Sequence, residues 1–398
     1  MRVCVVGAGA AGLCAAYHLH KAGIDHVVFE QTGLPGGTWV YQEHGSDIHS
    51  SMYRDLRTNL PVEVMGYPDF PFPSDAPSFA HHTVVRAYLD NFYENHVAPH
   101  KNVMFYAKVV KIKRGSRTPW EVDVDFNGVH CTEGFTHIMV CNGKNTVPRM
   151  PEILGLQTFA GTIEHSHGYR IPEKYAGKRV VVVGAGFSGI DIALEITAVT
   201  KQCLLSHRLA KPLKLAGVTE KPAITRVSGR QIYFGPNDYV DDIDYLMFCT
   251  GYRICVPFLD DYVMIDDGFR VRDVFRHSIL ISNPSVAFIG LPARIIPCVV
   301  FDYQVRYAIA LFTGAIPLPC EDEMRRELAE DKQQRDELEL KEIKFAHDMR
   351  GPLLWRYLQK FVDDGLGAVD PLYRRGYEAS HLARQKNLVG YRDQPLSL

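Results

Sequence analysis

The chain has 398 residues, of which 46% are hydrophobic and 23% charged, and its formal net charge is −2. This length allows two or three domains, and the balanced charge excludes the strongly basic surface that binding to nucleic acid or an anionic membrane requires. No run of about 20 uncharged apolar residues is present, so we expect a soluble protein without a membrane anchor, cytoplasmic by default and secreted if Met1 replaces a removed signal peptide.

The first segment predicts a strand, a glycine loop, a helix to about Lys21 and a second strand, from RVCVV, GAGAAG and HVVFE. A glycine loop in this context binds a pyrophosphate at the start of the helix. Gly7 makes the tight turn, Gly9 lets the backbone approach the phosphates, and Gly12 allows close packing of helix and strand. Glu30 ends the second strand, where a carboxylate accepts hydrogen bonds from a free ribose. The pattern therefore favours FAD or NAD.

A second copy of this pattern begins with KRVVVV, followed by GAGFSG, a helix over 190–200 and the strand QCLLSHR. Gly184, Gly186 and Gly189 take the same three roles as the first set of glycines. Arg208 stands at the strand end with no acidic residue nearby, and a guanidinium there suits the 2′-phosphate of NADP. We therefore expect FAD in the first unit and NADPH in the second.

These two copies predict an α/β protein with two Rossmann-like dinucleotide-binding domains. The expected FAD-binding domain is the larger and comprises residues 1–165 and 256–398, and the NADPH-binding domain, 166–255, is inserted into it. Within this frame, 103–129 alternates like an antiparallel meander, and 321–344 predicts a solvated helix with i,i+4 ion pairs. The nine cysteines contain no CxxC pair, and the histidines lack metal-ligand spacing, so we expect neither a metal site nor a dithiol centre.

Between the glycine loops lies FAGTIEHSHGY, which fits the pattern FxGxxxHSxxY. This motif resembles the identifying sequence of the flavin-containing monooxygenases, the class B flavoprotein monooxygenases. Four further segments resemble parts of that family in the same order along the chain: GGTW, HSSMYRDLRTNLPVEVMGYPDFPFP, CNGKNTVPRMP and FCTGY. Within the family the chain is similar to soluble insect enzymes that N-oxygenate plant alkaloids of the pyrrolizidine, senecionine-like type.

The resemblance implies an NADPH- and O2-dependent oxidoreductase that N-oxygenates or S-oxygenates soft nucleophiles through a C4a-hydroperoxyflavin. Tertiary amines such as plant alkaloids are the expected substrates, and alkaloid detoxification is the expected role. Because the cofactor carries the chemistry, no acid–base dyad is required.

Baeyer–Villiger or amine-hydroxylating chemistry is the alternative on the same fold, although the Baeyer–Villiger motif usually ends in tryptophan where this chain has Tyr169. A flavin- and NADP-dependent reductase or redox sensor is the alternative from another class. The expected partners are a small amine or sulfide substrate and O2. Formation of a homo-oligomer is compatible with the sequence.

Asn59 is the expected catalytic residue, because it matches the family asparagine that lies beside flavin and nicotinamide, and an amide donates and accepts without supplying a proton. Gln304 and Arg306 are expected to open a late helix whose positive end faces the flavin. The resemblance and the loops together imply FAD contacts from Gly7, Gly9, Ala10, Ala11, Gly12, Glu30, Thr38, Trp39, His49, Thr58, Asn59, Leu60, Val109 and Gln304. They imply NADP contacts from Gly184, Gly186, Ser188, Gly189, Asp191, Arg208 and Thr250.

The histidines of FAGTIEHSHGY are expected to be structural. His165 and Ser166 should fix the backbone by hydrogen bonds, Tyr169 should pack, and His167 falls at a variable position of the motif.

Overall fold

The computed structural model describes residues 1–43, 50–394 and 396, which form two compact α/β units. The larger unit comprises Met1–Val40, Arg57–Lys144 and Ile254–Leu398, and the smaller comprises Tyr41–Leu56 and Asn145–Arg253. The smaller unit begins before the expected position 166, because strand β9 (Thr162–His165) pairs with β16 (Tyr245–Phe248) of that unit.

A seven-stranded sheet in the order β20-β21-β22-β7-β1-β2-β3 forms the centre of the larger unit. The strands from β22 to β3 are parallel, and β20 and β21 extend the sheet as antiparallel neighbours. Their bounds are β1 Arg2–Val6, β2 Asp25–Phe29, β3 Val103–Met104, β7 His137–Val140, β20 Val274–Phe275, β21 Ile279–Leu280 and β22 Val286–Phe288. Alternate residues of β1 enter different cores: Val3 and Val5 pack beneath helices, whereas Cys4 and Val6 pack with a second sheet.

That second sheet is the predicted meander, which runs over residues 108–135 rather than 103–129. It consists of the antiparallel strands β4 (Lys108–Arg114), β5 (Trp120–Phe126) and β6 (Val129–Phe135). A short hairpin of β18 (Ile265–Asp266) and β19 (Arg270–Val271) completes the strands of this unit.

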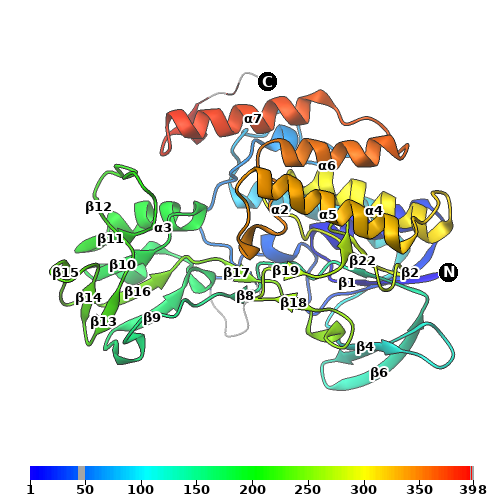
Figure 1. Ribbon diagram of the computed structural model, residues 1–398, viewed down its shortest axis with the longest axis horizontal. Helices are drawn as coiled ribbons and strands as arrows, with labels where there is room; N and C mark the ends of the chain where they lie inside the picture. The colour runs from blue at the N-terminus through cyan, green and yellow to red at the C-terminus, as the bar shows by residue number, and fades with distance from the viewer. Residues whose placement is uncertain (44–49, 395, 397–398) are drawn as a thin grey trace. The chain divides into compact units, whose positions relative to one another are not determined.

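The described residues of the larger unit form six α-helices: α1 Ala10–Lys21, α2 His82–His96, α4 Pro297–Thr313, α5 Glu321–Glu337, α6 Pro352–Asp363 and α7 Pro371–Lys386. Figure 1 shows α4, α5 and α6 running alongside one another, and Trp355 of α6 contacts the ring of Tyr377 in α7. The apolar stripes of α1, α2, α4 and α6 share one core, so this helical layer covers one face of the sheet.

The charge-dense helix α5 ends at Glu337 instead of Lys344, and it is not solvated along its whole length. The N–H of Leu340 bonds the carbonyl of Arg335 and the N–H of Glu339 bonds that of Asp336, while Glu339 has a φ of 58°. This is a Schellman termination made without glycine, and burial of Leu340 accompanies it. Arg335 is also buried, at 4% exposure.

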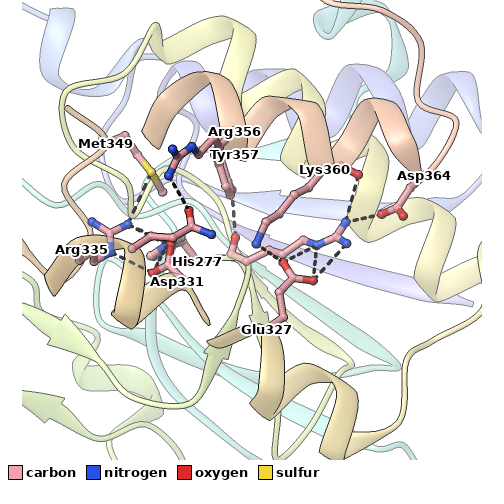
Figure 2. Close-up of polar contacts among 11 residues, drawn as sticks. His277, Glu327, Asp331, Arg335, Met349, Arg356, Tyr357, Lys360 and Asp364 are labelled. Atoms are coloured by element: carbon pink, nitrogen blue, oxygen red, sulfur yellow. Dashed lines mark hydrogen bonds and ion pairs between the residues drawn. The ribbon is translucent and has the colours of Figure 1, made fainter. Parts of the chain in front are cut away.

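Two adjacent residues in left-handed conformation connect the sheet to these helices. Arg276 and His277, both with a φ of 49°, form the turn between β20 and β21. Arg276 donates to Glu327 of α5 and to Asp364 beyond α6, and Figure 2 shows His277 beside Asp331 of α5. A turn with two left-handed residues favours Asn-Gly, so the backbone of Arg276 and His277 is strained. The contacts that their two side chains make stabilise the turn in spite of this strain.

The smaller unit contains a five-stranded parallel sheet in the order β12-β11-β10-β16-β9. Its remaining strands are β10 Arg179–Val183, β11 Gln202–Ser206 and β12 Val218–Lys221, and its helix is α3 Phe187–Thr197, close to the expected 190–200. Two smaller sheets are formed by β13 Arg226–Ser228, β14 Gln231–Tyr233 and β15 Tyr239–Val240, and by β8 Val147–Pro148 with β17 Tyr252–Arg253.

Candidate functional site

In the larger unit, the first glycine loop forms a backbone cradle at the start of α1. A Cβ atom at Gly12 would lie 1.8 Å from the carbonyl oxygen of Gly7, and one at Gly7 would lie 2.8 Å from that of Cys141. Gly9 is the N-cap of α1, and no side chain caps the helix. The first N–H groups of α1 are therefore available to an anion, as the pattern predicts.

The strand-end carboxylate beside this loop is held rigidly. Glu30 is buried, and one carboxylate oxygen accepts the N–H of Ala8 at 2.8 Å. The other accepts both the N–H and the hydroxyl of Thr32, each at 2.8 Å. Since a carboxylate offers about four acceptor positions, one remains for a further donor such as a ribose hydroxyl. Thr32 was not predicted from the sequence, although a hydroxyl two residues after a strand-end acid is a recognisable signal.

The GGTW turn lies directly on the glycine loop. The N–H of Gly36 bonds the carbonyl of Ala8 at 2.8 Å, and a Cβ atom at Gly37 would lie 2.9 Å from the Cα of Gly9. Gly36 and Gly37 have φ values of 109° and 54°, which other residues rarely adopt. This close approach places the short helix Gly37–Trp39, and with it Thr38, next to the loop.

The stretch around Asn59 contains an unsatisfied polar atom. Thr58 is buried, and its hydroxyl has no hydrogen-bond partner among the residues that the structure describes. Because a buried hydroxyl without a partner is costly, this atom fits a contact to a bound cofactor. Asn59 and Leu60 follow it, half-buried, and the side-chain oxygen of Asn59 accepts hydrogen bonds from Tyr391 and Arg392. The residues present therefore fit a dinucleotide.

One expected flavin contact, Gln304, lies deeper in the protein. The helix α4 begins at Pro297, so Gln304 and Arg306 lie in its middle and do not open it, contrary to expectation. Gln304 is fully buried, and its amide accepts from the N–H of Gly290 and donates to the hydroxyl of Tyr357. Both ends of this amide are thus occupied by protein groups.

Val109 and His49 complete the flavin set. Val109 lies in β4, packed in the core between the two sheets. His49 lies outside the described residues.

In the smaller unit the second glycine loop repeats the geometry of the first. A Cβ atom at Gly189 would lie 1.8 Å from the carbonyl oxygen of Gly184, whose own φ is 110°. Gly186 is the N-cap of α3, and a Cβ atom there would meet nothing within 4 Å. Ser188 is exposed in the first turn of α3, and Asp191 accepts a hydrogen bond from the hydroxyl of Tyr53 at 3.3 Å. The open space over Gly186 suits a phosphate.

Positive charge gathers at the strand ends of this unit. Arg208 is exposed just after β11 and makes no hydrogen bond or ion pair with the residues described. Arg149, which sequence reasoning missed, donates twice to the carbonyl of Thr250, at 3.0 and 2.7 Å. Burial lowers the pKa of Arg149, and the nearby Arg208 and Arg253 lower it further. Repulsion among guanidinium groups is relieved by an anion, so the cluster fits a phosphate ligand.

The histidine motif is structural, as predicted. The Nε2–H of His165 donates to the carbonyl of Gly251 at 3.0 Å, and its Nδ1 accepts from the N–H of His167 at 3.0 Å. Burial lowers the pKa of His165 to about 4, so the ring is neutral at pH 7. Tyr169 is fully buried, and its hydroxyl donates to Glu195 of α3. The motif therefore fixes the edge strand β9 and α3.

Among the described residues, one group has metal-ligand character: Cys14, His18 and Asp302, all buried. His18 Nε2 and Asp302 Oδ1 lie 2.6 Å apart, and Arg306 donates to the other oxygen of Asp302 at 2.7 Å. The carboxylate is thus already paired with two donors, and a metal ion would have to displace them.

Throughout the described part of the chain, no helix has the length and apolar character needed to cross a membrane.

Residues 1–213 and 209–348 match the family described as flavin-binding monooxygenase-like. Flavin-containing monooxygenase FMO GS-OX-like 7 of Arabidopsis thaliana is 34% identical over 360 residues, covering 81% of this chain and 75% of that protein. The solved structure of S-allyl-L-cysteine S-oxygenase from Allium sativum is similar with a TM-score of 0.91 and 29% identity, over 99% of this chain and 95% of its own. Tmm from Pelagibacter sp. strain HTCC7211 shares the fold, with a TM-score of 0.87 and 24% identity, over 100% and 94% of the two chains.

Proposed function

The chain belongs to the family of flavin-binding monooxygenases, whose cofactors are FAD and NADPH, and from this premise we propose that it transfers one oxygen atom of O2 to a soft nucleophile. The acceptor atom is a sulfide sulfur or a tertiary amine nitrogen, and the products are a sulfoxide or an N-oxide, NADP+ and water. Similarity to an S-oxygenase supports sulfur. The resemblance of the chain to soluble insect enzymes that N-oxygenate plant alkaloids supports nitrogen, with such alkaloids as the amine class.

The observation that carries this proposal is the pair of glycine cradles with different strand-end residues. We assign FAD to the cradle of the larger unit, where the Glu30 carboxylate suits a free ribose. We assign NADPH to that of the smaller unit, where Arg208 and Arg149 suit a 2′-phosphate. Bound FAD, once reduced by NADPH, supplies the oxygen-activating chemistry. The protein would hold the two pyrophosphates at the starts of α1 and α3, and Thr58 and Asn59 of the larger unit would orient the flavin.

A reductase or redox sensor is the contrasting hypothesis. A disulfide reductase needs a paired cysteine motif, and none of the nine cysteines forms a disulfide or belongs to a CxxC pair. Baeyer–Villiger chemistry requires a ketone substrate and gives an ester.

Product analysis separates these reactions. We expect the FAD-loaded enzyme with NADPH and O2 to convert a thioether such as an S-alkyl cysteine to its sulfoxide, or a polycyclic tertiary amine to its N-oxide, with one NADPH oxidised per product. A cyclic ketone serves as the comparison substrate. Oxidation of NADPH that yields only H2O2 with every thioether and amine tested would contradict the proposal, and ester formation would favour the Baeyer–Villiger alternative.

Replacing Arg208 by alanine tests the assignment of NADPH. Because a hydrogen bond to a charged group contributes about 1.5 to 3 kcal/mol, we expect the KM for NADPH to rise at least about tenfold while that for NADH changes little. Steady-state rates of cofactor oxidation measure both constants. Arg230→Ala is the matched control, since Arg230 is an exposed arginine of the same unit that pairs with Asp244. An unchanged KM for NADPH in Arg208→Ala would rule out a role for Arg208 at the 2′-phosphate.

A further inference from the structure

The C-terminal turn, Tyr391–Asp393, lies against the stretch that carries Asn59 in the larger unit. Arg392 donates from Nη2 to the side-chain oxygen of Asn59 and from Nε to the backbone oxygen of Thr58, the latter at 3.1 Å. The hydroxyl of Tyr391 donates to the same Asn59 oxygen at 3.3 Å. Residues more than 300 positions apart in the sequence thus meet at the expected catalytic amide.

The contact is reciprocal, which indicates that the C-terminal turn is docked in a defined position. Arg57 donates to the carbonyl of Arg392 at 2.7 Å, to Asp393 at 2.6 Å and to the carbonyl of Phe79 at 3.2 Å. Tyr391 is 2% exposed, and its ring meets the edge of Phe79 at 5.2 Å. The Arg57–Asp393 pair is solvent-exposed and contributes little, so burial of the Tyr391 ring supplies most of the docking energy.

These donors determine which way the Asn59 amide points. A guanidinium has donors and no acceptor, so the atom that faces Arg392 must be the amide oxygen. The NH2 group is then turned away from Arg392, and it makes no hydrogen bond with any described residue. Next to it in the sequence is Thr58, whose buried hydroxyl also has no partner among the described residues. The two side chains together offer unused donors at one place in the chain.

We propose that Arg392 is a positioning residue of the oxygenase, which holds the Asn59 amide in the orientation that presents its NH2 group to the flavin bound in the same unit. This rests on the function proposed above. An amide without Arg392 can rotate by about 180° and present its oxygen, because the two orientations have nearly the same shape. In the other orientation, an acceptor atom of the flavin would face the amide oxygen instead of the NH2 group and would have no hydrogen-bond donor from Asn59.

A double-mutant cycle of Asn59→Ala, Arg392→Ala and the combined variant tests this. The first readout is the visible absorption spectrum of the bound, oxidised FAD, before and after addition of NADP+. The second is the amount of product formed per NADPH oxidised. We expect Arg392→Ala to retain FAD, to change the spectrum in the same direction as Asn59→Ala, and to lower product per NADPH about tenfold. In the Asn59→Ala background the same substitution should have no further effect on either readout.

Three further variants grade the effect. Tyr391→Phe keeps the ring against Phe79 but removes the second donor to the amide oxygen, so a smaller change in the same direction is expected. Arg392→Lys restores one donor and should recover part of the spectrum. Arg374→Ala removes an exposed arginine of α7, paired with Glu378, and should leave the spectrum unchanged.

Additive effects of Asn59→Ala and Arg392→Ala would overturn the proposal, as would a wild-type spectrum and wild-type coupling in Arg392→Ala. Loss of FAD from Arg392→Ala but not from Arg392→Lys or Tyr391→Phe would assign the arginine a purely structural role and overturn it too. Failure of the wild-type enzyme to oxygenate any thioether or amine would refute the proposed function instead. The spectral cycle would still decide whether Arg392 acts through Asn59.

Discussion

Replacing Gly12 by alanine is expected to abolish FAD binding and to destabilise the larger unit by about 3 kcal/mol. The new methyl group would lie 1.8 Å from the carbonyl oxygen of Gly7 and 2.9 Å from its carbon, both backbone atoms that a rotamer change cannot move. The helix α1 must therefore separate from β1, and the cradle at its start opens. All three tryptophans, Trp39, Trp120 and Trp355, belong to this unit, so tryptophan fluorescence during urea unfolding reports its stability selectively.

Gly9→Ala is the matched control for this substitution. Gly9 has a φ of −72°, which alanine adopts, and its nearest new contact would be the Cα of Gly37 at an ordinary 3.6 Å. We expect the apoprotein of Gly9→Ala to unfold like the wild type, yet to bind FAD at least about tenfold more weakly, because the methyl group occupies the approach of the phosphates. Wild-type FAD affinity in Gly9→Ala would show that the phosphates bind elsewhere. Wild-type stability in Gly12→Ala would refute the packing argument.

Arg335→Met is expected to lower the free energy of unfolding of the larger unit by about 3 to 5 kcal/mol, because it removes one partner of a buried ion pair. Arg335 pairs with Asp331 at 2.8 Å (Figure 2). It also donates to the backbone oxygens of Phe345 and Asp348. Burial alone would raise the pKa of Asp331, but His277 and Arg335 hold it well below its usual range. Without the arginine, Asp331 keeps only His277 as a partner among the described residues, in a half-buried position.

Two comparisons isolate the buried pair. The double variant Arg335→Met, Asp331→Leu should be more stable than Arg335→Met alone, since it leaves no carboxylate without its cation. Arg325→Met, on the exposed face of the same helix, should change stability by less than about 1 kcal/mol, although Arg325 pairs with Glu321 and Asp273. Equal losses in Arg325→Met and Arg335→Met would contradict the idea that burial decides the effect.

The sequence was sufficient to predict both dinucleotide folds, because each requires a strand, three glycines and a helix at close spacing. Gly12 and Gly189 confirm the reason for that spacing, since any side chain at either position collides with the turn. The histidines of FAGTIEHSHGY were predicted to be structural, and the hydrogen bonds of His165 agree. The glycine pattern is local, which is why the sequence alone reveals it.

Contacts between distant residues were missed, and the ends of two helices were misjudged. Arg392 meets Asn59 only after the whole larger unit has folded, and nothing in its local sequence distinguishes it from a surface arginine. Arg335 lies in a run of charges that predicts a solvated helix, yet tertiary packing buries it. The end of α5 was also misplaced, because its left-handed residue is Glu339 rather than glycine. Gln304 lies in the middle of α4 because this helix begins at Pro297, and the hydrophobic periodicity of the sequence did not reveal that start.

The larger unit is assembled from chain segments that precede and follow those of the smaller unit. The ribosome therefore completes the smaller unit before it completes the larger one. All strands of the five-stranded sheet have been synthesised by residue 253, whereas β22, which pairs with β7, ends only at Phe288. Until then β7 is an edge strand whose Ile138, Met139 and Val140 are apolar and unpaired on one side. Nascent chains released between these two points would carry a finished smaller unit and an open, aggregation-prone sheet edge.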